Sequence, residues 1–167
     1  MIYRLMLIAL GALLVALVCA ASSPGDITGY SSGSNVWTLG AEYDSVNLDG
    51  FENVSGSDGP DTYHDASRTI QFNGKDTKVE VYLYFTRGYL EMFTINVPAK
   101  AMSFKALKKY YAARLSKCKH HDYGESSCDW VDKDKDYVSL GAVTDESSGA
   151  DITAINYGWR SYVPVAE

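Results

Sequence analysis

The stretch VEVYLYFT at residues 79–86 decides the fold, because its side chains alternate between two kinds. Valine, leucine and phenylalanine occupy every second position, with glutamate, tyrosine and threonine between them. Successive side chains of a β-strand point to opposite faces of its sheet, so this alternation predicts a strand with one buried face. Glu80, Tyr82 and Tyr84 share the other face.

The flanking sequence predicts two more strands joined to this one by tight turns. Residues 68–72 also alternate, and the dipeptide Asn73-Gly74 that follows suits the positive φ angles of a hairpin turn. On the other side, 89–97 is rich in the aromatic and β-branched residues that strands favour. Pro98 ends this strand, because proline cannot donate a hydrogen bond to its neighbour.

A helix is predicted at about 103–117. Ser103 is a suitable N-cap, and the apolar residues that follow recur at spacings of three and four. Three further strands are predicted around 128–131, 137–143 and 152–162. The sequence therefore predicts an α+β fold of order βββαβββ, in which a largely antiparallel sheet of five to six strands carries the helix on one face.

The N-terminal part predicts export. One basic residue precedes a short apolar run at 5–18, and small residues follow, which is the layout of a cleavable signal peptide at 1–21. The run is shorter than the roughly 20 residues of a spanning helix, so no membrane span is expected in the mature chain. A Ser/Gly-rich flexible leader at 22–34 and a single domain at 35–167 are predicted next.

Cys19 leaves a second interpretation of this segment open. Lipidation of that cysteine would make the protein a lipid-anchored envelope protein. Val18 fits this interpretation poorly, because a lipoprotein signal has a small residue just before its cysteine. The net charge of −6 makes nucleic acid an unfavourable partner, since an acidic surface repels phosphate.

The two remaining cysteines, Cys118 and Cys128, predict one disulfide bond, as an even pair does in an exported chain. A zinc site that combines these thiols with His120 or His121 is the weaker alternative, because the nine-residue spacing matches no known zinc motif. The aspartates at 132–136 lack the glycine and glutamate of a calcium loop and predict a charged turn. We therefore expect neither a metal nor a cofactor.

The pattern resembles small exported bacterial α+β domains, in which a hairpin leads into a helix, a Tyr-Gly pair, a tryptophan and closing strands. The resemblance spans about 70–162 and concerns turn and core positions, so it implies a fold and no activity. The residues that carry it are Arg87, Gly88, Tyr89, Leu90, Phe104, Leu107, Leu115, Tyr123, Gly124, Trp130, Val138, Leu140 and Tyr157.

No nucleophile, metal or phosphate-binding motif accompanies these elements, so an enzyme is the less favoured class. The rival hypothesis is a secreted hydrolase that uses His64, beside Asp65 and near Asp61, or His120 and His121, with carboxylates. The chain has 13 tyrosines, a residue enriched in recognition surfaces. We therefore predict a binding module, an inhibitor or envelope accessory protein among the possible roles, whose partner is another envelope or extracellular protein. Its candidate binding residues are Glu80, Tyr82 and Tyr84. The alternative for their shared face is burial under the N-terminal segment, since a central strand can be covered on both sides.

Overall fold

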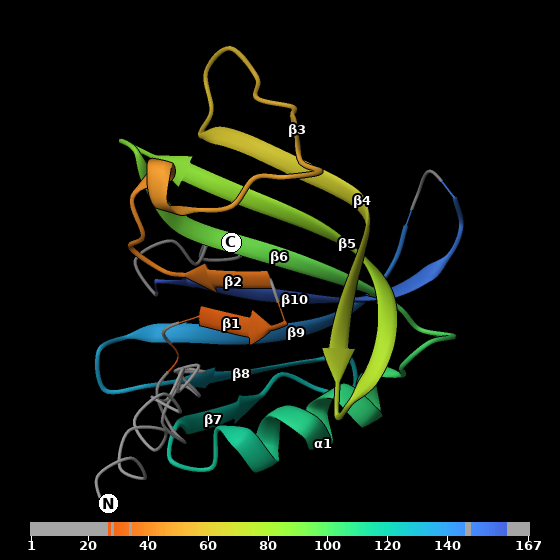
Figure 1. The fold of residues 1–167 in the computed structure, drawn as a ribbon. Helices are drawn as coiled ribbons and strands as arrows, with labels where there is room; N and C mark the ends of the chain where they lie inside the picture. Colours follow the sequence, from red (N-terminus) through yellow and green to blue (C-terminus); the bar gives the residue numbers. More distant parts are fainter. Residues whose placement is uncertain (1–26, 28, 34, 146–147, 160–167) are drawn as a thin grey trace, which may run out of the picture.

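The computed structural model describes residues 27, 29–33, 35–145 and 148–159, and a curved antiparallel sheet of eight strands dominates them (Figure 1). The strand order is β3-β4-β5-β6-β10-β9-β8-β7. The strands of this sheet are β3 (Glu52–Asn53), β4 (Asp61–Phe72), β5 (Lys75–Thr86), β6 (Tyr89–Pro98), β7 (Lys119–Asp122), β8 (Ser127–Val131), β9 (Asp136–Thr144) and β10 (Asp151–Trp159). A hairpin of β1 (Gly29–Ser32) and β2 (Asn35–Thr38), a 3-10 turn η1 (Tyr43–Ser45) and a helix α1 (Phe104–Arg114) complete the described elements.

The large sheet consists of two antiparallel meanders, β3 to β6 and β7 to β10. Helix α1 connects them by carrying the chain from the middle of the sheet to its far edge, where β7 begins. The second meander then returns strand by strand until β10 pairs with β6. This crossover decides which residues of the two meanders become neighbours.

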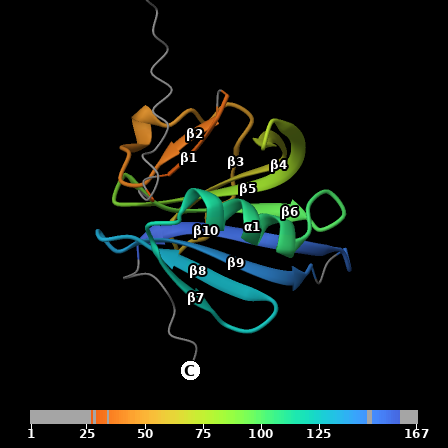
Figure 2. The same cartoon turned by 90° about the horizontal axis from the view of Figure 1, so that it is seen from below.

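Helix α1 and the β1–β2 hairpin lie on the same face of the sheet (Figures 1 and 2). The hydrophobic core lies between these two layers and contains stacked aromatic rings. Phe93 stacks on Tyr157 with ring centroids 4.4 Å apart, and the Tyr157 hydroxyl is hydrogen-bonded to that of Tyr111 on α1 at 2.8 Å. Within the described part of the chain, no helix or second sheet covers the opposite face, which we call the open face.

The helix is confirmed, and its bounds are shorter than expected. The Ser103 side chain accepts a hydrogen bond from the Ala106 amide, as the sequence predicted for an N-cap. The last turn ends at Arg114 rather than near 117, because the chain turns at Leu115 and the Cys118 amide bonds back to its carbonyl. Leu107 and Tyr111 form the buried side of the helix.

The sheet confirms the α+β class and the antiparallel pairing, but the predicted strand number and order were wrong. Along the chain, four strands of the large sheet precede α1 and four follow it, rather than three and three. The unpredicted strands β3 and β7 are the two edges, and both are short and largely polar. Edge strands of this kind carry no alternating apolar pattern, so periodicity does not detect them.

Strand β1 lies inside the segment that the sequence assigned to a flexible leader. Its residue Tyr30 is only 6% exposed and stacks on Trp37 of β2, which is 2% exposed. Gly33 in the intervening turn has a φ of 60°, a conformation that glycine adopts without strain. The Ser/Gly composition there thus includes a hairpin turn, and two aromatic rings hold the hairpin on the core.

The expected disulfide between Cys118 and Cys128 is absent from the structure. Cys128 lies opposite Asp122 in the β7–β8 ladder, whereas Cys118 lies just before Lys119, at the other end of β7. Three strand steps of about 3.3 Å each separate Lys119 from Asp122, and this distance exceeds the reach of a disulfide. The strand that sequence analysis missed is therefore what keeps the two cysteines apart.

None of the helices that the structure describes has both the length and the apolar character needed to cross a membrane. The predicted signal peptide, its cleavage site and Cys19 lie outside the described residues.

Candidate binding surface

A row of side chains crosses the open face from one edge of the sheet to the other, with one residue on each strand. Each residue is the register partner of the next, so all eight point to the same side. We call this set the polar row: Glu52, His64, Tyr82, Thr94, Asn156, Ser139, Asp129 and His121. Neighbouring strands are about 4.8 Å apart, so the polar row extends for roughly 34 Å.

Hydrogen bonds join the central members of the polar row. The Thr94 hydroxyl donates to Asn156 Oδ1 at 2.8 Å, and Asn156 Nδ2 donates to the Ser139 hydroxyl at 3.3 Å. Thr94 belongs to the first meander, whereas Asn156 and Ser139 belong to the second. The row is therefore continuous across the seam where β6 and β10 meet.

Glu80 is the centre of a network beside the first end of the polar row. Its Oε1 atom accepts hydrogen bonds from His64 Nε2 at 2.8 Å and from the Tyr82 hydroxyl at 3.0 Å. Its Oε2 atom accepts a third from Asn96 Nδ2 at 2.9 Å. The donors come from β4, β5 and β6, so this carboxylate fixes side chains of three adjacent strands.

The network shifts the titration of its members. Partial burial acts to raise the pKa of Glu80, but the hydrogen bonds from Asn96, His64 and Tyr82 outweigh burial and lower it. Burial, followed by the hydrogen bond to Glu80, raises the pKa of Tyr82 to about 12. At neutral pH the site therefore holds an ionised carboxylate and a neutral phenol.

Three aromatic rings form a stack at this end of the open face. The imidazole of His64 lies on the ring of Tyr82 with centroids 4.4 Å apart and planes at 14°. Tyr82 in turn is nearly parallel to Tyr84, with centroids 6.3 Å apart. All three side chains are half-buried, so the rings support one another while part of each remains accessible to a partner.

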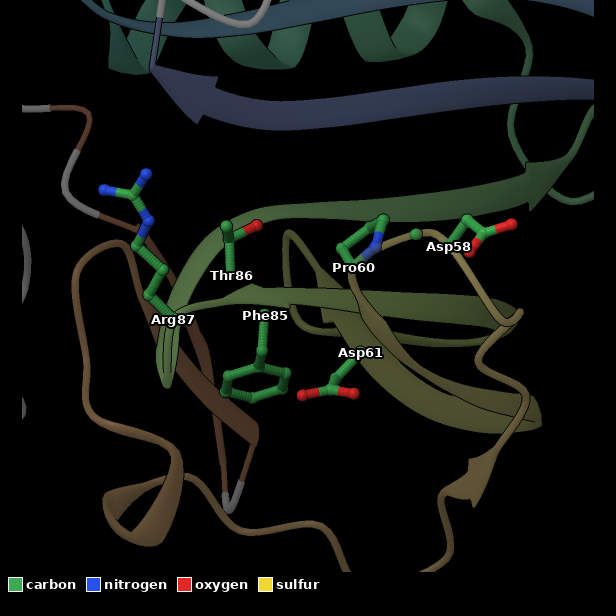
Figure 3. A pocket seen from close by; sticks show the side chains of 7 residues that line it. Asp58, Pro60, Asp61, Phe85, Thr86 and Arg87 are labelled. Carbon is green, nitrogen blue, oxygen red and sulfur yellow. The ribbon is translucent and has the colours of Figure 1, made fainter.

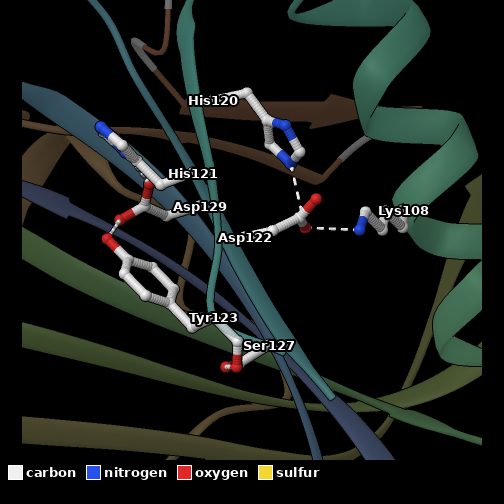
Figure 4. A network of polar contacts seen from close by, with 7 residues as sticks. All are labelled: Lys108, His120, His121, Asp122, Tyr123, Ser127 and Asp129. Carbon is white, nitrogen blue, oxygen red and sulfur yellow. Dashed lines mark hydrogen bonds and ion pairs between the residues drawn. The ribbon is translucent and has the colours of Figure 1, made fainter. Parts of the chain in front are cut away.

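A second histidine–carboxylate–tyrosine group lies at the other end of the polar row (Figure 4). His121 Nδ1 donates to Asp129 Oδ1 at 2.6 Å, and the Tyr123 hydroxyl donates to Asp129 Oδ2 at 2.9 Å. This group has the same chemistry as His64, Glu80 and Tyr82. Both ends of the row thus combine an imidazole, an acid and a phenol.

A cavity of about 480 Å³ opens beside this second group, whose Tyr123 and Asp129 line it. Gly141 lines the cavity without contributing a side chain, and a Cβ atom at this position would meet nothing within 4 Å. Tyr137 lies directly over Gly158 and closes one side of the cavity. The other residues that line the cavity are both apolar and polar. They are Met92, Tyr123, Ser127, Cys128, Asp129, Ser139, Leu140 and Asn156.

Another hollow, of about 370 Å³, lies where β4 begins and β5 ends (Figure 3). Two aspartates, Asp58 and Asp61, line it together with Phe85 and Arg87. Figure 3 shows the Arg87 guanidinium pointing away from both carboxylates. The hollow is formed by a loop and a turn, and it contains no member of the polar row.

The structure places the predicted site residues as follows. Glu80, Tyr82 and Tyr84 share the open face, as the alternation of 79–86 predicted. His64 joins them, but Asp65 does not, because neighbouring strand residues point to opposite faces; Asp65 pairs with Arg68 at 2.7 Å instead. His120 and His121 likewise point to opposite faces, and only His121 reaches the open face (Figure 4).

The charged turn predicted at 132–136 is present between β8 and β9. The Asp132 Oδ1 atom accepts the amides of Asp134 and Asp136, and Oδ2 accepts the amide of Ile27. This carboxylate thus shapes the turn and holds the N-terminal segment.

Sequence reasoning missed the members of the polar row that lie on other strands. Thr94, Asn156, Ser139 and Asp129 of the polar row, and Asn96 beside it, are polar residues that alternate with apolar ones along their strands. That alternation is the signal that could have found them. Their meeting in one row depends on strand order, which periodicity within one strand does not give.

Comparisons with protein-family models, with curated proteins and with solved structures find no match for this chain.

Proposed function

We propose that this chain is an exported binding module, and that it recognises another envelope or extracellular protein through its open face. The observation that carries the proposal is the polar row, which crosses all eight strands on the face that α1 and the β1–β2 hairpin leave uncovered. On a sheet face that only contacts solvent, side chains need no fixed arrangement. Here the side chains are ordered by hydrogen bonds and ring stacking, so a partner meets a preorganised surface.

The composition of the open face supports a protein partner. Tyr82, Tyr84 and Tyr123 offer large contact areas at low cost in side-chain entropy, as tyrosines do in recognition surfaces. Asn156 and Ser139, which are half-buried, offer polar groups between the tyrosines, and the buried Thr94 hydroxyl positions Asn156. The carboxylates of Glu80 and Asp129 favour a partner that presents cationic or amide groups.

The edges of the sheet are less suited to binding. Strand β3 has only two residues, and β7 has four that are charged or histidine. Short, charged edge strands discourage the addition of a strand from another chain. The face, rather than an edge, is therefore the surface that we assign to the partner.

A hydrolase is the second candidate, because His121 and Asp129 form the histidine–carboxylate half of a catalytic triad. Among the described residues, however, no serine, threonine or cysteine donates a hydrogen bond to His64, His120 or His121. A nucleophile within reach of the base is the signature of that mechanism. The geometry thus supports binding better than hydrolysis.

The test is the capture of a partner from envelope and culture-fluid extracts, followed by direct binding of the purified partner. Two variants probe the two ends of the polar row: the double variant Tyr82→Ser, Tyr84→Ser, and Tyr123→Ala. Each is expected to weaken binding at least tenfold, because aromatic anchors carry most of the energy of an interface. Tyr123 is 60% exposed, so its replacement leaves folding intact.

The matched control is Val36→Ser, an exposed position on β2, on the opposite side of the molecule. It is expected to bind as the unaltered chain does. Equal binding by Tyr123→Ala, by the folded double variant and by the control would exclude the open face. Loss of a hydrolytic activity in folded His121→Ala, without loss of binding, would favour the second candidate.

A further inference from the structure

Three side chains of different chemistry meet on the covered face of β7 and β8, beside α1. They are His120, Asp122 and Cys128, and a ligand atom of each lies within 4.8 Å of the other two. The group is separate from the polar row, because it points to the other side of the sheet. Figure 4 shows His120 and Asp122 on one side of β7 and His121 on the other.

The register of the two strands brings these residues together. Asp122 lies directly opposite Cys128, and His120 lies two residues from Asp122, on the same side of β7. His120 also stacks on Trp130 with ring centroids 4.8 Å apart, which orients its imidazole. The backbone thus places the three side chains before any ligand binds.

An imidazole, a carboxylate and a thiolate are the three ligand types that zinc takes in proteins. His120 Nε2 lies 3.5 Å from Asp122 Oδ1. Two ligands bound at about 2.1 Å to a tetrahedral ion are separated by roughly 3.4 Å, so this pair already has the required spacing. Cys128 forms no disulfide in the structure, which leaves its sulfur available for coordination.

We propose that His120, Asp122 and Cys128 bind one zinc ion, with water at the fourth position. The soft thiolate selects zinc over calcium and magnesium, which prefer oxygen ligands alone. Binding releases the thiol proton of Cys128 to solvent. The ion reaches the buried sulfur past His120 and Asp122, whose side chains are 35% and 51% exposed.

Lys108 of α1 makes a specific contribution to this site. Its ammonium group pairs with Asp122 Oδ1 in the structure, and so it supplies the positive charge beside the carboxylate (Figure 4). A zinc ion bound to Asp122 carries two positive charges. It would therefore be repelled by the Lys108 ammonium, or would displace it from the carboxylate. Lys108 therefore weakens zinc binding, and its removal strengthens it.

The experiment titrates the reduced full chain with Co²⁺, which replaces zinc and gives a near-ultraviolet charge-transfer band when a thiolate binds it. One cobalt ion per chain should produce this band, and Zn²⁺ should abolish it. Cys128→Ser should remove the band, and His120→Ala should weaken cobalt binding at least tenfold. Lys108→Met should tighten it on the order of tenfold, since a unit charge about 4 Å away is removed.

The chain offers a matched control for two of the three ligands, the cysteine and the histidine. Cys118→Ser and His121→Ala change the neighbouring cysteine and histidine outside the group, and both should keep the cobalt band. Because Cys128 is buried, circular dichroism first establishes that its variant is folded; the exposed His120 tests the site independently of that outcome. Absence of the band, its persistence in folded Cys128→Ser, or equal cobalt affinity with and without His120 would overturn the proposal.

Discussion

At the scale of single residues, Glu80 shows how opposing effects decide the character of the open face. Partial burial disfavours its charge, whereas three hydrogen-bond donors favour it. The donors prevail because each is held by its own strand and therefore loses little freedom in forming the bond. The carboxylate is consequently charged at neutral pH and binds three strands together.

This balance predicts a pH dependence that Glu80→Gln removes. A carboxyl whose pKa is lowered on folding stabilises the protein above its ordinary value of 4.5, and this contribution is lost as the pH falls through the lower, folded-state pKa. At pH 7 the variant should unfold with a free energy about 1 kcal/mol lower than the unaltered chain. Urea denaturation at pH 7 and at pH 3 should show this difference shrinking in acid.

Glu52→Gln is the control for this measurement, since Glu52 is an exposed glutamate on the same open face. It should change the free energy of unfolding by less than about 0.5 kcal/mol at either pH. A Glu80→Gln difference that is the same at pH 3 and pH 7 would mean that the Glu80 network does not favour the charged carboxylate.

At the scale of elements, the pairing of β9 with β10 shapes the cavity on the open face. Tyr137 lies opposite Gly158, and the ring covers the glycine. Gly141, four residues further along β9, also contributes no side chain to the cavity. The two glycines differ in one respect: a Cβ atom at Gly158 would lie 3.0 Å from the Tyr137 hydroxyl, whereas one at Gly141 would meet nothing within 4 Å.

We therefore expect opposite results from two identical substitutions. Gly158→Ala should lower the free energy of unfolding by roughly 1–2 kcal/mol, because the buried Tyr137 ring must shift to make room. Gly141→Ala should be neutral or slightly stabilising, since alanine restricts the unfolded chain more than glycine does. Denaturant unfolding of both variants measures the difference, and equal effects would contradict the β9–β10 register.

At the scale of the whole molecule, the helix crossover is the feature on which the open face depends. By carrying the chain to the far edge, α1 lets the second meander run back to the first and close the sheet at β6 and β10. The same helix and the β1–β2 hairpin cover one face and leave the other open. One connection thus creates both the continuous polar row and the access to it.

The proposed role also requires export, which the N-terminal sequence predicts. Peptidase cleavage between Ala20 and Ser22 should give a mature chain that begins near Ala21, because small residues occupy these positions. N-terminal sequencing and the intact mass of material from the envelope or culture fluid measure this directly. A lipid-modified Cys19 at the N-terminus would contradict it and make the protein membrane-anchored.

Part of this architecture could be predicted from the sequence. The strand at 79–86, its two hairpin neighbours and the helix after Ser103 were predicted correctly as elements, as was the shared face of Glu80, Tyr82 and Tyr84. The edge strands β3 and β7 were not, because their residues lack an apolar pattern. The disulfide was predicted from an even pair of cysteines in an exported chain, and that count carries no information on the β7–β8 register that separates Cys118 from Cys128.

The sequence by itself determined which side chains face the core and which face outward in the strands that alternate, such as 79–86, because alternation is a local property of the extended backbone. Only the tertiary structure decided which strands are neighbours. That order brings His64, Thr94, Asn156 and Asp129 into one row, and it brings His120 to Cys128. The physical reason is that both groupings depend on pairing between distant segments, which is set by the α1 crossover and the packing of the core.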